Sequence, residues 1–178
     1  MGITAFIGVI GSGKDFRCKL EVSKGATQID FADKLRESLW LTLGWAPKDV
    51  QEYEYFKQSI FTMNQIGVIT GRQLIQNMGH ELKKVFGNSV WVDQWEKSVV
   101  ASGAENICVS DCRYPIEAQK LILNNAKFVF CNYRGDRYTA INKHSSERMA
   151  QYFLEIGYMD GQTIEISDLT SYILAEKV

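Results

Sequence analysis

Several residue types are scarce in this chain of 178 residues, and each scarcity excludes a class of protein. Only 2 residues are proline while 46% are hydrophobic, and this combination excludes an intrinsically disordered chain. Charge of one sign is also lacking, because 20 Lys and Arg residues nearly balance 21 Asp and Glu residues. The formal net charge of −1 argues against a protein that wraps a nucleic acid polymer or coats an anionic membrane.

Signals for zinc, redox-active cysteines and membranes are equally sparse. Histidine occurs only at His80 and His144, which leaves little material for a His-based zinc site. The 4 cysteines include no CxxC pair, so we expect reduced, packed thiols in a cytoplasmic protein. The apolar segment 3–10 has no basic region before it, unlike a signal peptide. Every apolar run is far shorter than the ~20 residues that span a bilayer.

The order of apolar and amphipathic segments predicts an α/β fold. At the usual ~100–200 residues per domain, a chain of this length forms one domain. Short apolar segments alternate with helical patterns over most of it, as in a parallel sheet with helices on both faces. The expected strands of this five-stranded parallel sheet are Ile3–Ile10, Thr27–Phe31, Asn106–Ser110, Lys127–Asn132 and Gln162–Ile166.

Residues 32–103 interrupt this alternation, because several helical patterns follow one another there with no strand signal between them. Leu35, Leu39 and Leu43, for example, recur at the spacing of one helix face. A helical insertion into a single domain is the simplest explanation. The core of that domain would then consist of residues 1–31 and 104–178.

Local chemistry predicts where three helices begin. Thr70 and Gln73 have the spacing of a capping box, in which each side chain accepts a hydrogen bond from the other residue's backbone N–H. Pro115 fits the first turn of a helix, where the missing N–H has no intrahelical partner in any case. Ser167 or Asp168 is expected to cap the last helix.

Residues 8–14 read GVIGSGK and match the phosphate-binding pattern GxxxxGK, between an apolar strand and a helix. Glycines let successive amides point toward phosphate oxygens, and the helix N-terminus adds a partial positive charge of ~0.5 e. Lys14 would lie against the β- and γ-phosphates of ATP. A glycine-rich turn that merely links strand to helix is the alternative. The residues assigned to ATP in this loop are Gly8, Gly11, Ser12, Gly13, Lys14 and Asp15.

Asp15 departs from that pattern, because the residue after the lysine is usually a Ser or Thr that holds Mg²⁺. A carboxylate beside bound polyphosphate is repelled unless a metal ion, an arginine or a hydroxyl lies against it. Asp15 therefore either binds Mg²⁺, directly or through water, or faces the acceptor substrate. The alternative is a solvated acid that the helix dipole favours.

Five stretches occur in a characteristic order along the chain. They are Gly11–Asp15 (GSGKD), Asp30–Leu35 (DFADKL), Thr70–Gly79 (TGRQLIQNMG, followed later by Trp91), Val109–Glu117 (VSDCRYPIE) and His144–Glu147 (HSSE). Together they resemble the motifs of the bacteriophage-type deoxynucleoside monophosphate kinases, a branch of the P-loop nucleoside monophosphate kinases. The resemblance implies a three-layer P-loop NTPase fold, ATP and Mg²⁺, a deoxynucleoside monophosphate acceptor and a homodimer. It also implies the host cytoplasm if the protein is phage-encoded.

A kinase that joins two polyanions must bring arginines to the phosphate loop, because positioning and electrostatics carry nearly all of its catalysis. Arg72 and Gln76 lie one helical turn apart and would hold the acceptor phosphate and read a base edge. A surface Arg–Gln face is the alternative. Asp111 and Arg113 follow a strand at the ligand edge of the sheet. Asp111 would orient metal-bound water or Arg113, and Arg113 would grip the acceptor phosphate. A structural ion pair at the strand end is the alternative.

Other candidate residues come in three pairs, Arg134 with Arg137, His144 with Glu147, and Asp33 with Lys34. The arginine pair follows the fourth strand and is assigned to ATP, unless both side chains are simply solvated. The resemblance places the His–Glu pair near the acceptor nucleotide, whereas capping of a helix start is the structural alternative. The Asp–Lys pair, at the end of the second strand, would contact the acceptor.

We therefore expect Mg²⁺-dependent phosphorylation of deoxynucleoside monophosphates to diphosphates by ATP. The expected catalytic residues are Lys14, Asp15, Arg72, Asp111 and Arg113. Two alternatives stay open. One is another small P-loop kinase, such as a dephospho-coenzyme A kinase or an adenylate-kinase-like enzyme. The other is a nucleotide-binding regulatory protein without turnover. Asp15 leaves this alternative open, because it stands where the usual motif has a Ser or Thr that holds Mg²⁺.

Overall fold

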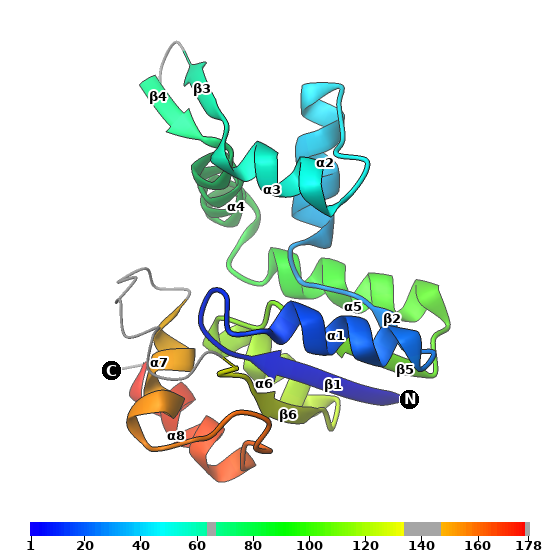
Figure 1. Ribbon diagram of the computed structural model, residues 1–178, viewed down its shortest axis with the longest axis vertical. Coiled ribbons are helices and arrows are strands. Elements are labelled where there is room, and N and C mark those ends of the chain that lie inside the picture. Colours follow the sequence, from blue (N-terminus) through cyan, green and yellow to red (C-terminus); the bar gives the residue numbers. More distant parts are fainter. Residues whose placement is uncertain (64–66, 134–146, 177–178) are drawn as a thin grey trace. The chain divides into compact units, whose positions relative to one another are not determined.

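The structure is a computed structural model, and it describes residues 1–63, 67–133 and 147–176 (Figure 1). The chain divides into two compact units. The sheet unit consists of Met1–Phe31 with Trp95–Val178, and the inserted unit consists of Ala32–Gln94.

Four parallel strands form the centre of the sheet unit, in the order β2-β5-β1-β6. Consecutive residues of the central strand β1 are buried, among them Ala5, Phe6 and Ile7, as expected for a strand covered on both faces. The prediction of an α/β fold with a parallel sheet is therefore confirmed. The strands are β1 (Gly2–Ile7), β2 (Thr27–Gln28), β5 (Asn106–Val109) and β6 (Lys127–Phe130).

Helices flank this sheet (Figure 1). They are α1 (Lys14–Ser23), the later part of α5 (Val90–Ser102), α6 (Pro115–Leu123), α7 (Arg148–Glu155) and α8 (Ile166–Ala175). Pro115 begins α6, as predicted. The predicted cap of the last helix is wrong, because Glu165 occupies the N-cap of α8. The hydroxyl of Tyr158 explains the earlier start, since it accepts from Glu165 N at 3.0 Å and donates to Asp168 Oδ2 at 2.7 Å.

The fifth strand expected at residues 162–166 is reduced to one isolated antiparallel bridge between Thr163 and Val129. Backbone hydrogen bonds from Phe130 N to Gln162 O (2.8 Å) and from Ile164 N to Phe128 O (2.9 Å) flank the bridge. The chain therefore meets the edge of β6 running in the opposite direction. In the described residues the sheet has four strands.

Thiols and large apolar side chains fill the core of the sheet unit. All four cysteines are free and buried, which agrees with the expectation of packed thiols. One core cluster contains Cys18, Cys108 and Cys131, together with Phe6 and Val129. The cluster joins α1 to the strands that lie beneath it.

The inserted unit contains a β-hairpin that was not predicted. Its elements are α2 (Asp33–Leu43), α3 (Val50–Gln58), β3 (Ile60–Met63), β4 (Gly67–Thr70), α4 (Gly71–Phe86) and the start of α5. The expectation of helices alone was wrong because the hairpin has apolar residues on both faces. Ile69 is buried while Ile60 and Val68 are exposed, so the sequence lacks the apolar–polar alternation that marks a strand.

The capping box at the start of α4 is confirmed. Gln73 N donates to Thr70 Oγ1 at 3.2 Å, and Thr70 N donates to Gln73 Oε1 at 2.8 Å. A buried cluster of Leu39, Phe56 and Leu74, with Ile69 of the hairpin, then packs α2, α3 and α4 together.

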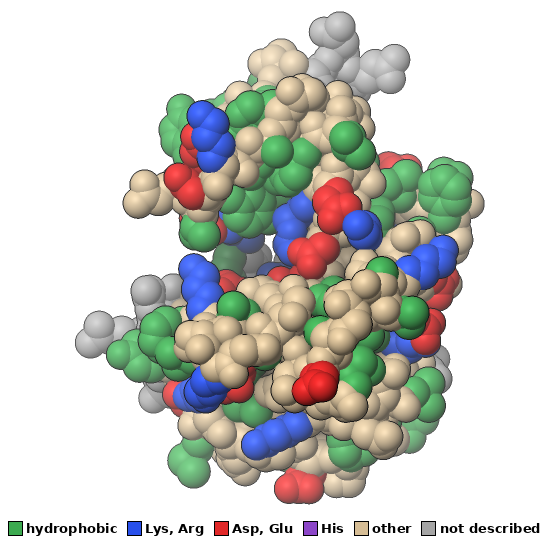
Figure 2. Space-filling view, turned by 90° about the vertical axis from the view of Figure 1, so that its right-hand side faces the viewer, with side chains coloured by type: hydrophobic (Ala, Val, Ile, Leu, Met, Phe, Trp, Pro, Cys, Tyr) green, Lys and Arg blue, Asp and Glu red, His purple; other side chains and the backbone are tan. Residues whose placement is uncertain are grey.

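Charged side chains of both signs are interspersed with apolar ones on the face shown in Figure 2. Within the described ranges, no helix combines the length and the apolar character needed to cross a membrane.

Candidate functional site

A tight glycine-rich loop, residues 8–13, connects β1 to α1 (Figure 1). Gly11 and Gly13 have φ angles of 74° and 91°, in the left-handed region that favours glycine. A Cβ atom on Gly8 would lie 2.4 Å from Cys131 O and 2.2 Å from Ser12 Oγ. Glycine is therefore required at Gly8, where the loop packs against the end of β6.

Lys14 begins α1, and its side chain turns back under the loop. It is 5% exposed, and Nζ donates to Val9 O at 3.1 Å. Burial lowers the pKa of Lys14, and the nearby Arg113 guanidinium lowers it further, whereas Asp15 and Glu147 oppose the shift. Two cations thus share the space beside the loop.

Glu147 connects the loop to Arg113. Its Oε2 accepts from Ile10 N at 2.8 Å, and its Oε1 forms an ion pair with Arg113 Nη1 at 3.0 Å. Glu147 lies at the N-cap of α7. Of the residues expected in the site, the structure therefore brings together Lys14, Arg113 and Glu147.

Glu117 fixes the backbone that carries Arg113. This buried carboxylate accepts from Arg113 N at 2.7 Å and from Tyr114 N at 3.0 Å through Oε2. The sequence alone predicts no role for Glu117, although this residue ends the stretch Val109–Glu117. Its position three residues after Tyr114, at the start of a helix with Pro115 in the first turn, was the signal that could have identified it.

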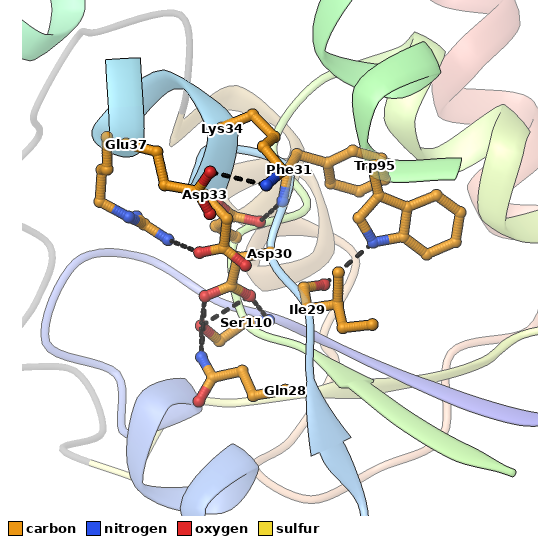
Figure 3. A network of polar contacts seen from close by, with 11 residues as sticks. Gln28, Ile29, Asp30, Phe31, Asp33, Lys34, Glu37, Trp95 and Ser110 are labelled. Atoms are coloured by element: carbon orange, nitrogen blue, oxygen red, sulfur yellow. Dashed lines mark hydrogen bonds and ion pairs between the residues drawn. The ribbon is translucent and has the colours of Figure 1, made fainter. Parts of the chain in front are cut away.

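Carboxylates also join the ends of β2 and β5 (Figure 3). Oδ1 of the buried Asp30 accepts from Ser110 N at 2.7 Å, and its Oδ2 accepts from Gln28 Nε2 at 2.7 Å. In return, Asp111 Oδ1 accepts from Phe31 N at 2.8 Å. Asp111, expected to orient metal-bound water or Arg113, therefore contacts the backbone that follows the neighbouring strand.

Arg17 and Asp160 form a further contact near the loop that the sequence did not predict. Arg17 Nη2 lies 2.7 Å from Asp160 Oδ2, and Asp160 Oδ1 accepts from Asn132 N at 2.7 Å. This pair ties α1 to the end of β6. No local pattern links residues 143 positions apart, so only the fold could reveal the pair.

Several expected site residues lie in the inserted unit. Arg72 is half-buried and Gln76 is exposed, both on α4. Asp33 and Lys34 belong to the first turn of α2 rather than to the end of a strand. Their side chains form ion pairs within that helix, Asp33 with Arg36 at 2.5 Å and Lys34 with Glu37 at 2.6 Å.

Three expected site residues, Arg134, Arg137 and His144, lie outside the described residues. Asp15 is exposed in the first turn of α1, directly after Lys14. Among the residues described, no group of three or more His, Cys, Asp or Glu side chains could hold a metal ion without other ligands.

Comparison with known proteins adds no family assignment. No protein-family model matches the chain, and a search of curated proteins finds no match.

Proposed function

We propose that the glycine-rich loop binds the phosphates of ATP and that the protein phosphorylates deoxynucleoside monophosphates. The observation that carries the proposal is the convergence of Lys14 and Arg113 on this loop. Burial and mutual repulsion both disfavour two adjacent cations, and both effects lower the pKa of Lys14. Together with the N-terminus of α1, the two side chains would offer donors to the oxygens of a polyanion, whose charge would offset their repulsion.

Ser12 supports phosphate as the ligand. Its side chain is 1% exposed, and within the described residues its hydroxyl has no hydrogen-bond partner. A buried hydroxyl without a partner costs free energy, which a phosphate oxygen in the loop would recover by accepting its hydrogen bond. The left-handed Gly11 and Gly13 give the loop the tight turn that such a cradle needs.

Asp15 has the chemistry to help hold Mg²⁺. The ion is commonly bound by one or two carboxylates together with substrate phosphates and water, so it does not need a cage made of protein alone. An exposed carboxylate one residue after Lys14 fits that role. When bound, Mg²⁺ would neutralise charge on the phosphates.

The described residues suggest how phosphoryl transfer would proceed. Lys14 and Arg113 would stabilise the negative charge on the transferred group from fixed positions, with little reorganisation. The acceptor phosphate oxygen is already anionic, so no strong general base is required. Arg72 and Gln76 would bind the acceptor, and the Arg134 segment would act on ATP. In this proposal the four-stranded sheet belongs to a P-loop NTPase fold.

The decisive experiment incubates the purified protein with ATP, Mg²⁺ and one acceptor at a time. The acceptors are the common deoxynucleoside and ribonucleoside monophosphates and dephospho-coenzyme A. We expect a diphosphate product with one or more deoxynucleotides. A product only with dephospho-coenzyme A would point to the other small kinases. Binding of ATP without any product would favour a regulatory protein and contradict the kinase proposal.

A further inference from the structure

A single buried carboxylate, that of Glu147, joins three separate segments of the sheet unit. One oxygen accepts from Ile10 N of the glycine-rich loop, 137 residues away, and the other holds Arg113 Nη1, 34 residues away. The Glu147 side chain is only 4% exposed, whereas that of Arg113 is 31% exposed. The carboxylate is therefore inside the fold, and its cationic partner reaches toward solvent.

This geometry is unsuited to a direct contact between Glu147 and a nucleotide phosphate. A carboxylate only accepts hydrogen bonds, and both oxygens of Glu147 already accept from protein donors. A phosphate group brought against it would be repelled. A guanidinium, in contrast, has five N–H donors and can hold a carboxylate and a phosphate oxygen together.

We infer that Glu147 is a positioning residue that fixes Arg113 against the glycine-rich loop for phosphoryl transfer. The inference rests on the proposed kinase function, and it replaces the expectation that Glu147 binds the acceptor. Its physical basis is preorganisation, since misplacing a catalytic group by about 1 Å can cost ~10²-fold in rate. Without Glu147, neither the loop nor the Arg113 guanidinium would keep this shared anchor.

The test is Glu147→Gln in the full chain. Glutamine retains an oxygen that can accept from Ile10 N, although as a neutral and weaker acceptor, and it turns an NH₂ donor toward Arg113, which removes the ion pair. We expect kcat to fall by ~10²-fold while the KM for the acceptor changes little. A raised acceptor KM with an unchanged kcat would show a direct substrate contact and overturn the inference.

Glu155→Gln provides the matched control. Glu155 is an exposed residue at the other end of the same helix, α7. The substitution makes the same change of charge, and we expect wild-type kinetics. If both variants lost activity to the same degree, a general effect of charge would explain the loss, and Glu147 would have no special role.

A double-mutant cycle asks whether Glu147 acts through Arg113. Arg113→Lys keeps the positive charge but loses the planar guanidinium group with its paired donors. The single variant should therefore already have a low kcat. Adding Glu147→Gln to this variant should lower kcat little further, because the guanidinium that Glu147 positions is already absent. Losses that multiply in the double variant would contradict the inference.

The amide resonance of Ile10 separates this inference from the kinase proposal. In the wild-type protein a charged carboxylate accepts from that N–H, whereas a neutral amide oxygen accepts more weakly in Glu147→Gln. The resonance should therefore move upfield in the variant even if no substrate is turned over. Unchanged Ile10 and Arg113 resonances would overturn the positioning role. A wild-type protein without kinase activity would overturn only the proposed function. If Glu147→Gln fails to fold, Glu147→Asp keeps the charge with a shorter reach and should give a smaller loss in the same measurements.

Discussion

Lys14 is the residue on which the proposed chemistry depends most directly. Replacing it with methionine keeps the length of the side chain and removes the charge beside the loop. We expect diphosphate formation to fall by about 10²–10³-fold, the usual loss when a preorganised electrostatic group is removed. The measurement is the steady-state rate at saturating ATP, together with ATP affinity by calorimetry.

Lys19→Met is the control for Lys14→Met, because Lys19 is exposed on the same helix. It should retain wild-type activity. Full activity of the Lys14 variant would show that the loop does not serve phosphoryl transfer.

Cys131, at the end of β6, makes stability depend on pH. Burial raises the pKa of this thiol from its ordinary value of 9.0 to about 11. The fold therefore prefers the neutral thiol, and this stabilisation is complete below the ordinary pKa. It is lost as the pH rises through the folded-state pKa. We expect the urea midpoint to fall between about pH 9 and pH 11.

A Cys131→Ala variant should show a weaker dependence on pH over the same interval. Some dependence should persist, because burial also raises the pKa of Cys18, Cys108 and Cys112. An equal slope in the variant and the wild-type protein would mean that Cys131 does not titrate in this way.

At the scale of elements, Trp95 of α5 is the contact that fixes this helix to the end of β2. Its Nε1 donates to Ile29 O at 2.9 Å, and its ring lies 5.0 Å from that of Phe31, centroid to centroid (Figure 3). Trp95→Phe keeps an aromatic ring but leaves the buried carbonyl without this donor. The free energy of unfolding should fall by about 1–3 kcal/mol, measured by urea denaturation.

Trp45→Phe is a suitable comparison, because Trp45 is a partly exposed tryptophan whose indole packs against Trp40 and Phe56. A smaller loss of stability is expected there. If the two variants were equally stable, the hydrogen bond to Ile29 would contribute nothing measurable.

For the whole molecule, the sequence predicted what depends on neighbouring residues. The capping box at Thr70 and the start of α6 at Pro115 follow from chemistry within one helical turn, and both are confirmed. The alternation of strands and helices similarly predicted the parallel sheet.

Features that depend on distant residues were not predictable in the same way. The hairpin β3-β4 has apolar residues on both faces, so its sequence does not show which face is buried. The carboxylates of Glu147 and Asp160 act on segments more than a hundred residues earlier in the chain, at Ile10 and Arg17. Their residue types were visible in the sequence, but their partners became evident only from the fold.

The two points at which the chain passes between the units, after Phe31 and before Trp95, suggest that the inserted unit can be removed from the gene as one piece. The chain leaves the sheet unit after Phe31 and re-enters it at Trp95, and these two rings are in contact. A short glycine linker in place of residues 32–94 should therefore close the gap without disturbing the sheet. We expect the shortened protein to fold and to bind ATP but to phosphorylate no nucleotide, as measured by circular dichroism, calorimetry and the kinase assay.

A shortened protein that does not fold would show that the sheet unit needs the inserted one. If it folds, residues 32–94 can be replaced by another segment without loss of the sheet unit. If the proposed function holds, acceptor choice could then change by replacing one contiguous stretch of the gene, while the sheet unit stays as it is.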